Sequence, residues 1–339
     1  MFNNSIKIMF NFILMSGLLI IMSSNSWLGA WMGLEINMLS FIPLMSNDNN
    51  ILSTEASLKY FLIQALASSI LLFLIISSSF NENMFMMYFS LSKTFLATPL
   101  LLKSGVAPMH WWFPSVMEGL SWMNCLILLT IQKMAPLMLL SYTITFNNYI
   151  FFIIIIISVT IGAIGGLNQT SLRKIITYSS INHLGWLLIA MKLNESMWIS
   201  YFMIYSLLTS TIISMIYTSQ ISSINQTFQM TKNKILKLMM FSSLLSLGGL
   251  PPFLGFLPKW IIIQYMLINE ILILPSIMVM MSLITLYYYL RISYSAFILM
   301  NAEIKWNFEM INEIPKLSLI LTIMSTLGLI SLTMMFNIF

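Results

Sequence analysis

The chain has 339 residues, of which 59% are hydrophobic and only 7% are charged, and its formal net charge is +5. Soluble domains contain about 25% charged residues, so ten acidic and fifteen basic side chains are too few to cover a soluble domain of this size. The basic residues are scattered along the chain, which argues against a nucleic-acid partner. A single cysteine, Cys125, excludes an intrachain disulfide framework.

Long apolar runs separated by short polar segments predict an all-α polytopic membrane protein of about eleven transmembrane helices. A helix needs about 20 mostly apolar residues to cross the hydrocarbon layer, and continuous runs of this length lack the alternation of a β-barrel strand. We expect one transmembrane domain over residues 1–339. The predicted spans are 6–23, 27–45, 56–77, 84–103, 123–142, 149–167, 172–191, 197–218, 235–268, 276–299 and 317–337.

Eleven spans place the two ends of the chain on opposite sides of the membrane, and the basic residues between the spans indicate the orientation. Loops on the inner side carry an excess of Lys and Arg. One side holds only Lys192, whereas the side of the N-terminus holds Lys7, Arg173, Lys174, Lys232, Lys234, Lys237, Lys305 and Lys316. The sequence therefore predicts an N-in, C-out protein, in which Arg173, Lys174 and the cluster 232–237 set the topology and contact lipid headgroups.

Two spans contain glycine and proline residues that predict broken helices. One break lies around 103–110 and the other around 248–259. Proline removes a backbone donor and clashes with the preceding turn, and non-helical backbone at membrane depth survives only inside protein or along a water-filled cavity. One broken span in each half, each beside a lysine, indicates an antiporter-like inverted repeat around a transport site. The alternative is a pair of packing kinks with snorkelling lysines.

Four charged residues inside the predicted spans are candidates for a proton relay. Glu35 lies in the middle of the second span, where a charge costs about 3 kcal/mol. Lys103 and Lys259 lie beside the two breaks, and Lys133 lies midway along the fifth span. A glutamate that faces several lysines can exchange a proton when its pairing changes.

Other titratable residues have more open roles. His183 titrates near neutral pH and follows several polar residues, so it is either a relay residue or a packing residue. We interpret His110 as structural. Glu55 and Lys59 have the spacing of an ion pair within a helix. Lys93 falls inside a predicted span, and its role stays open.

The same stretches resemble the subunit 2 family of mitochondrial NADH dehydrogenase, arthropod forms most closely. The resemblance runs in order from about residue 20 to about residue 300, and the last 35 or so residues match only in hydrophobicity. The segments that carry it are 31–35, 40–43, 53–56, 132–136, 167–174 and 248–260.

The resemblance implies an antiporter-like subunit in the membrane arm of respiratory complex I, the proton-pumping NADH:ubiquinone oxidoreductase of the mitochondrial inner membrane. It implies a shortened antiporter fold, with the N-terminus in the matrix and the C-terminus toward the intermembrane space. Glu35 would pair with Lys103, Lys133 would be the central lysine, and Lys259 would lie next to the proton exit. The implied partners are other membrane-arm subunits, including neighbouring antiporter-like subunits, and lipid such as cardiolipin.

The NADH, FMN, iron–sulfur and ubiquinone sites of that family lie on other subunits, so we expect an enzyme subunit that itself binds no cofactor and no metal. Two alternatives to proton translocation within the complex stay open. The chain could be a stand-alone cation/proton antiporter, or a structural linker of the membrane arm. The sequence also leaves open whether the subunit pumps a proton itself or passes on an electrostatic signal, and in which direction.

Overall fold

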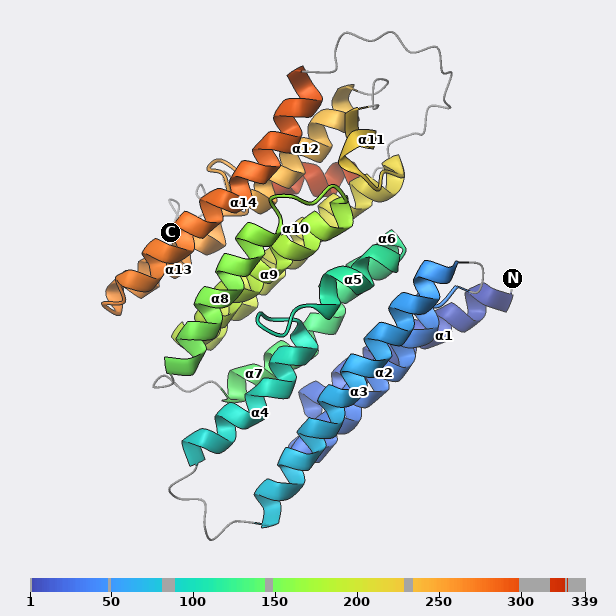
Figure 1. Ribbon diagram of the computed structural model, residues 1–339, viewed down its shortest axis with the longest axis vertical. Helices are drawn as coiled ribbons and strands as arrows, with labels where there is room; N and C mark the ends of the chain where they lie inside the picture. Colours follow the sequence, from blue (N-terminus) through green and yellow to red (C-terminus); the bar gives the residue numbers. More distant parts are fainter. Residues whose placement is uncertain are drawn as a thin grey trace. The chain divides into compact units, whose positions relative to one another are not determined.

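The computed structural model describes residues 2–47, 50–80, 89–143, 149–228, 234–298, 318–326 and 328. These residues are almost entirely helical, which confirms the predicted all-α class, and one isolated β-bridge joins Ser171 to Ser223. They fall into two compact units, unit 1 (Met1–Ile154) and unit 2 (Ile155–Phe339). Figure 1 labels the helices in chain order.

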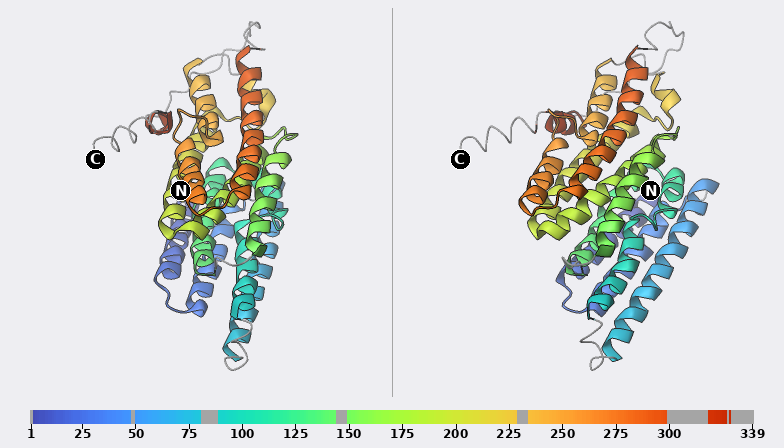
Figure 2. Two further views of the ribbon diagram at one scale, coloured as in Figure 1. Left: turned by 90° about the vertical axis from the view of Figure 1, so that its left-hand side faces the viewer. Right: turned by 60° about the vertical axis from the view of Figure 1, so that its left-hand side comes forward.

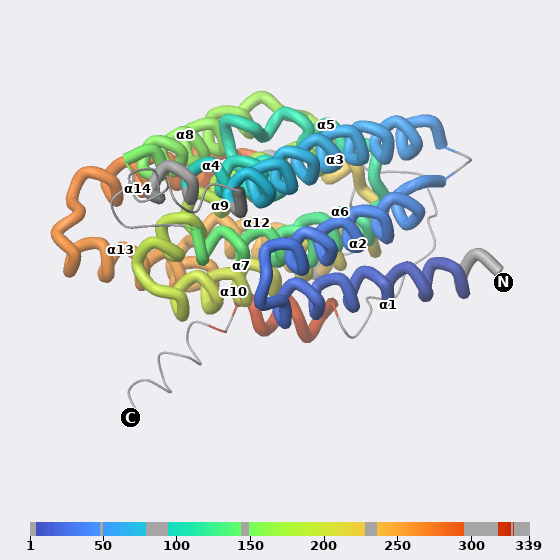
Figure 3. Tube along the Cα trace, turned by 90° about the horizontal axis from the view of Figure 1, so that it is seen from below, coloured from blue at the N-terminus to red at the C-terminus, as the bar shows by residue number. Residues whose placement is uncertain are grey.

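Unit 1 is built from helices that pack closely where glycine replaces a larger residue. α1 and α2 lie side by side (Figure 3). Glycine at position 33 permits this close approach, because a Cβ there would stand only 3.0 Å from the Gly17 carbonyl oxygen. α3 packs against α2, α4 and α5, and α7 packs against α4. The helices are α1 (Phe2–Ser23), α2 (Trp27–Met45), α3 (Ile51–Phe80), α4 (Phe89–Ser104), α5 (Trp112–Gly119), α6 (Trp122–Leu129) and α7 (Ile131–Thr143).

Unit 2 has a buried helix, α9, that contacts α10, α13 and α14. α12 and α14 lie side by side (Figure 2). Residues 318–326 are also helical, and the Ser325 carbonyl accepts a hydrogen bond from the Leu254 amide at 3.2 Å. The helices are α8 (Tyr149–Gly165), which begins in unit 1, α9 (Leu172–Leu193), α10 (Glu195–Ser219), α11 (Ile224–Phe228), α12 (Lys234–Gly248), α13 (Phe256–Ile268) and α14 (Ile273–Ile298).

Six of the described helices are long and apolar enough to cross a membrane, and three shorter ones are apolar. The multi-pass membrane class is therefore confirmed, whereas the count of eleven spans and the single domain stay predictions. The predicted spans 84–103, 276–299 and 317–337 fall partly outside the described residues. The six long stretches are Ser5–Ser23, Trp27–Met45, Ile51–Ser78, Trp122–Thr143, Glu195–Ser219 and Ile273–Tyr294.

Helical hydrogen bonding stops between α4 and α5 and between α12 and α13, where the sequence predicts breaks. After α4, Gly105 has a φ of +76°, and the Val106 amide donates to the Leu101 carbonyl at 3.1 Å. After α12, Gly249 has a φ of +85°, and the same bond recurs at 3.4 Å. Each helix thus ends in a Schellman-type cap, in which a left-handed glycine turns the chain back over the last carbonyls. The shared cap is what two related halves would produce.

Candidate functional site

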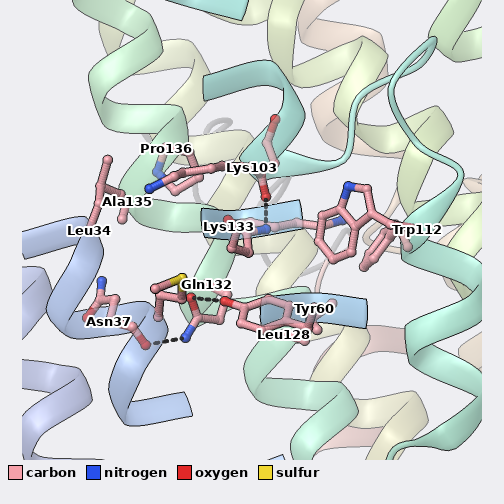
Figure 4. Close-up of a pocket in the computed structure, with 14 residues that line it drawn as sticks. Leu34, Asn37, Tyr60, Lys103, Trp112, Leu128, Gln132, Lys133, Ala135 and Pro136 are labelled. Carbon is pink, nitrogen blue, oxygen red and sulfur yellow. Dashed lines mark hydrogen bonds between the residues drawn. The ribbon is translucent and has the colours of Figure 1, made fainter. Parts of the chain in front are cut away.

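Unit 1 encloses a small cavity of about 20 Å³, lined by residues of α2 to α7. A volume of this size holds about one water molecule. Two lysines, Lys103 and Lys133, reach the cavity together, and Figure 4 shows them with the neighbouring polar and aromatic side chains. The polar side chains in the lining, besides the lysines, are Asn37, Tyr60, Gln64, Ser104 and Gln132.

Lys103 is held at the C-terminal end of α4, beside the first break. The residue is 7% exposed and lies in the last turn of the helix, where the partial negative charge of the helix end favours a cation. The freed carbonyls of this turn are satisfied by side chains. Gln64 Nε2 donates to the Lys103 carbonyl at 3.3 Å, and the Trp112 indole donates to the Leu102 carbonyl at 3.1 Å. These two backbone carbonyls at the break therefore have hydrogen-bond partners, as buried backbone groups require.

Glu35 acts on Lys103 at longer range. The residue is half-buried on α2, and its charge interacts with that of Lys103. Within the described part of the chain, these two side chains form no ion pair within 4.0 Å. The predicted ion pair of Glu55 and Lys59 within one helix is confirmed, with 3.7 Å between nitrogen and oxygen. The pairing implied for Glu35 and Lys103 is thus a through-space interaction in this structure.

Lys133 lies on α7 in a locally loosened helix. α6 ends at Leu129, and Pro136 lies one turn after the lysine, where it removes an amide from the helical ladder. The lysine is only 2% exposed. Its Nζ stands 4.6 Å from the centroid of the Phe113 ring, within the range of a cation–π interaction.

A glutamine bridge ties the helix of Lys133 to the helix of Glu35. The Tyr60 hydroxyl donates to Gln132 Oε1 at 3.2 Å, and Gln132 Nε2 donates to the Asn37 carbonyl at 3.5 Å (Figure 4). The bridge thereby joins α2, α3 and α7 on one side of the cavity. Since Gln132 directly precedes Lys133, this bridge fixes the register of the lysine relative to α2.

In unit 2, Lys259 engages the backbone across the second break. It is 6% exposed in the first turn of α13, and its Nζ donates to the Gly248 carbonyl at 2.9 Å. The cation thus closes the negative C-terminal end of α12. A Cβ on Gly249 would stand 3.1 Å from this Nζ, so the close approach of the lysine favours a glycine there.

His183 has a defined partner on the neighbouring helix. Its Nδ1 lies 2.8 Å from the Tyr201 hydroxyl, and both residues are buried. The Tyr205 ring lies 5.2 Å from the imidazole, centroid to centroid. A buried, oriented imidazole serves a relay and a packing role equally well, so the two alternatives of the sequence analysis stay open.

The four residues predicted for the relay, and His183 with its two open roles, divide between the two units. Unit 1 holds Glu35, Lys103 and Lys133, and unit 2 holds His183 and Lys259. Of the remaining titratable residues, His110 is buried beside Trp111, and Lys237 is buried on α12. The side chains of Lys93, Lys232, Lys234, Lys305 and Lys316 lie outside the described residues.

The sequence did not predict a role at the site for five residues that line the cavity: Asn37, Tyr60, Gln64, Phe113 and Gln132. Amides inside apolar spans are detectable by the argument applied to the charges, because each needs a buried hydrogen-bond partner. The two aromatic residues carry no such signal, since phenyl and phenol rings are ordinary in apolar helices.

Comparisons with known proteins identify the family of the chain. The family described as NADH:quinone oxidoreductase/Mrp antiporter, transmembrane, matches residues 24–285. NADH-ubiquinone oxidoreductase chain 2 of Anopheles gambiae is 53% identical over 337 residues, which cover 97% of each chain. The same-named protein of Aedes aegypti is 53% identical over 334 residues, again 97% of each chain.

A solved structure has the same fold. A chain of respiratory complex I from Thermus thermophilus, solved with bound aureothin, superposes with a TM-score of 0.80 at 23% identity, over 94% of this chain and 76% of that chain. The antiporter-like fold is thereby confirmed. The chain belongs to the NADH:quinone oxidoreductase/Mrp antiporter transmembrane family, within the group of NADH-ubiquinone oxidoreductase chain 2 proteins.

Proposed function

We propose that this chain is a membrane-arm subunit of proton-pumping NADH:ubiquinone oxidoreductase, complex I, and that it moves protons through a relay of buried side chains. The family supports the first part, because relatives named as chain 2 of that enzyme match 97% of the chain. The second part rests on the charged residues Glu35, Lys103, Lys133 and Lys259, with His183 as a further candidate.

The observation that carries the proposal is the pair of lysines on one water-sized cavity. Two ammonium groups on the same buried cavity repel each other, so the cavity favours a single proton shared between Lys103 and Lys133. The negative charge of Glu35 attracts the ammonium form of Lys103. A change in the position or protonation of Glu35 would therefore transfer the proton to Lys133, through water in the cavity.

Unit 2 supplies the later part of the proposed relay. Lys259 is buried and held against the Gly248 carbonyl, and His183 is oriented by Tyr201. In the proposed relay, each of these two groups would exchange its proton when its hydrogen-bond partner changes. The shared helix caps at the two breaks support an inverted repeat, in which each unit contributes one broken helix with its lysine.

We place the redox chemistry on other subunits. Two histidines and one cysteine in the whole sequence offer few ligands for haem or iron–sulfur groups. NADH, FMN, the iron–sulfur clusters and ubiquinone would accordingly bind elsewhere in the complex. This chain would contribute proton transfer that is driven by those reactions.

The proposed location is the mitochondrial inner membrane, with the N-terminus in the matrix and the C-terminus toward the intermembrane space. The basic residues of the sequence support this orientation, because they gather on one side of the predicted spans. The partners are other membrane-arm subunits, including neighbouring antiporter-like ones. Cardiolipin is the proposed lipid contact of the basic side.

The test compares buried and exposed charges with the same substitutions. Glu35→Gln and Lys103→Met should each lower NADH-driven proton pumping and coupled ubiquinone reduction by tenfold or more, while the complex still assembles. Glu55→Gln and Lys59→Met are the matched controls, because this pair lies on the surface with side chains 52% to 56% exposed. The controls should keep the full rate. Unchanged pumping in both buried variants would refute the relay.

The two alternatives give different results. A structural linker predicts that the buried variants reduce the amount of assembled complex and leave the activity per complex unchanged. A stand-alone antiporter, favoured by the Mrp antiporters in the same family, predicts that the purified chain alone exchanges cations for protons in liposomes. The proposed function predicts no flux in such liposomes.

A further inference from the structure

Phe113 lies at a position that connects the first break to Lys133. It belongs to the first turn of α5, directly after the break, and is fully buried. Its side chain rests against Gly105, since a Cβ on that left-handed glycine would meet the ring at 3.4–3.5 Å. Lys133 Nζ stands 4.6 Å from the centroid of the same ring. The ring thus contacts both the glycine of the break and the lysine, and it lines the cavity.

An aromatic face attracts a cation, because the ring carries partial negative charge above and below its plane. This attraction is strongest where water is absent, and Lys133 is only 2% exposed. The neutral amine of the same lysine gains no comparable attraction. The position of Phe113 thus favours the protonated form of Lys133.

Other titratable groups also lie around Lys133. The ammonium of Lys103 lines the same cavity and repels it, while Glu35 acts on Lys103. The phenol of Tyr60 also lines the cavity. The remaining titratable groups with described side chains on α1, on α3 to α7 and in the first break are Lys7, Glu55, Lys59, His110, Glu118, Cys125 and Tyr142, of which all except His110 and Cys125 are exposed.

We propose that Phe113 is a positioning residue for Lys133, whose ring holds the ammonium group at the cavity and stabilises its protonated form. The ring does for Lys133 what the carboxylate of Glu35 does for Lys103. Two lysines on one cavity thereby have different counter-groups, one charged and one aromatic. A charged counter-group can respond to a change in its own protonation, whereas an aromatic one is constant. This inference rests on the proposed function, in which Lys133 carries a proton.

The experiment measures NADH-driven proton pumping by the assembled complex, in sealed membrane vesicles, as a function of pH. Phe113→Leu and Phe113→Met keep an apolar side chain and remove the ring. Because the ring favours the protonated lysine, its loss should move the alkaline limb of the profile to lower pH by about one unit. Phe113→Tyr keeps an aromatic face and should keep the limb in place. The pH position of a limb does not depend on the amount of complex, so a reduced yield leaves the comparison valid.

Phe41→Leu is the matched control. Phe41 is also fully buried in unit 1, but its ring packs edge-on against Tyr60, with centroids 5.4 Å apart. This variant should keep the alkaline limb where it is. An unmoved limb in Phe113→Leu and Phe113→Met, or an equal shift in Phe113→Tyr or Phe41→Leu, would overturn the inference.

Lys133→Met separates the inference from the function on which it rests. If that variant pumps at the normal rate, the proposed role of Lys133 fails, and the inference fails with it. If it stops pumping while Phe113→Leu keeps its pH profile, only the role of Phe113 is refuted.

Discussion

The ammonium group of Lys259 donates a hydrogen bond to the carbonyl oxygen of Gly248 at 2.9 Å, so a cation closes the helix that precedes the second break. At the first break, the lysine lies before the glycine turn and its side chain lines a cavity. At the second break, the lysine lies after the turn and reaches back to the helix end. A lysine therefore accompanies each of the two glycine turns, before the turn at the first break and after it at the second. Removing the proton from Lys259 must weaken its bond to the backbone, which couples protonation to the geometry of the break.

Replacement of Lys259 by arginine separates its two roles. Arginine can still cap the Gly248 carbonyl, but it stays charged at every accessible pH. We expect Lys259→Arg to keep the thermal stability of the assembled complex and to lose at least tenfold in proton pumping. Lys259→Met should lose both, because the carbonyl is then left without its charged donor. Normal pumping by Lys259→Arg would show that this lysine only caps the helix and transfers no proton.

Gly249→Ala should destabilise the second break. The residue has a φ of +85°, which costs a side-chain-bearing residue about 1–2 kcal/mol. Its Cβ would also press on Lys259 Nζ at 3.1 Å. The measurement is the temperature at which the purified complex loses half of its activity, and we expect it to fall by several degrees. Gly248→Ala is the control, since Gly248 has a helical conformation and its Cβ would find no neighbour closer than 3.3 Å. Equal effects in both variants would contradict this account.

The sequence was informative wherever a single residue has a strong local cost. A carboxylate in an apolar span has a high cost of burial in lipid. Glycine and proline in a long span interrupt the backbone hydrogen bonds that a membrane helix needs. Glu35 and both breaks could therefore be predicted before any contact was known. The role proposed for Phe113 could not, because it depends on a contact between a ring of α5 and a lysine of α7. The bond between Lys259 and Gly248 spans 11 residues, and it depends on the turn geometry between them.

The glutamine bridge should show coupling between its two partners. Tyr60→Phe removes only the hydroxyl that donates to Gln132 Oε1 at 3.2 Å, and Gln132→Leu removes the acceptor. Each single variant should reduce the thermal stability of the complex. The double variant should lose about 1 kcal/mol less than the sum, because the second change has no bond left to break. Strict additivity would show that the hydroxyl and the amide contribute independently.

His183 and Tyr201 offer the test that decides between a relay and a packing role for the histidine. Their hydrogen bond is 2.8 Å long and buried. If His183 passes a proton on, His183→Gln should reduce pumping by tenfold or more in a complex that assembles normally. Tyr201→Phe should reduce pumping less, because the imidazole remains but loses its orientation. Since the tyrosine then acts only through the histidine, the double variant should pump no worse than His183→Gln alone. If the pair only packs, all three variants should lower the stability of the complex and leave the protons pumped per electron pair unchanged.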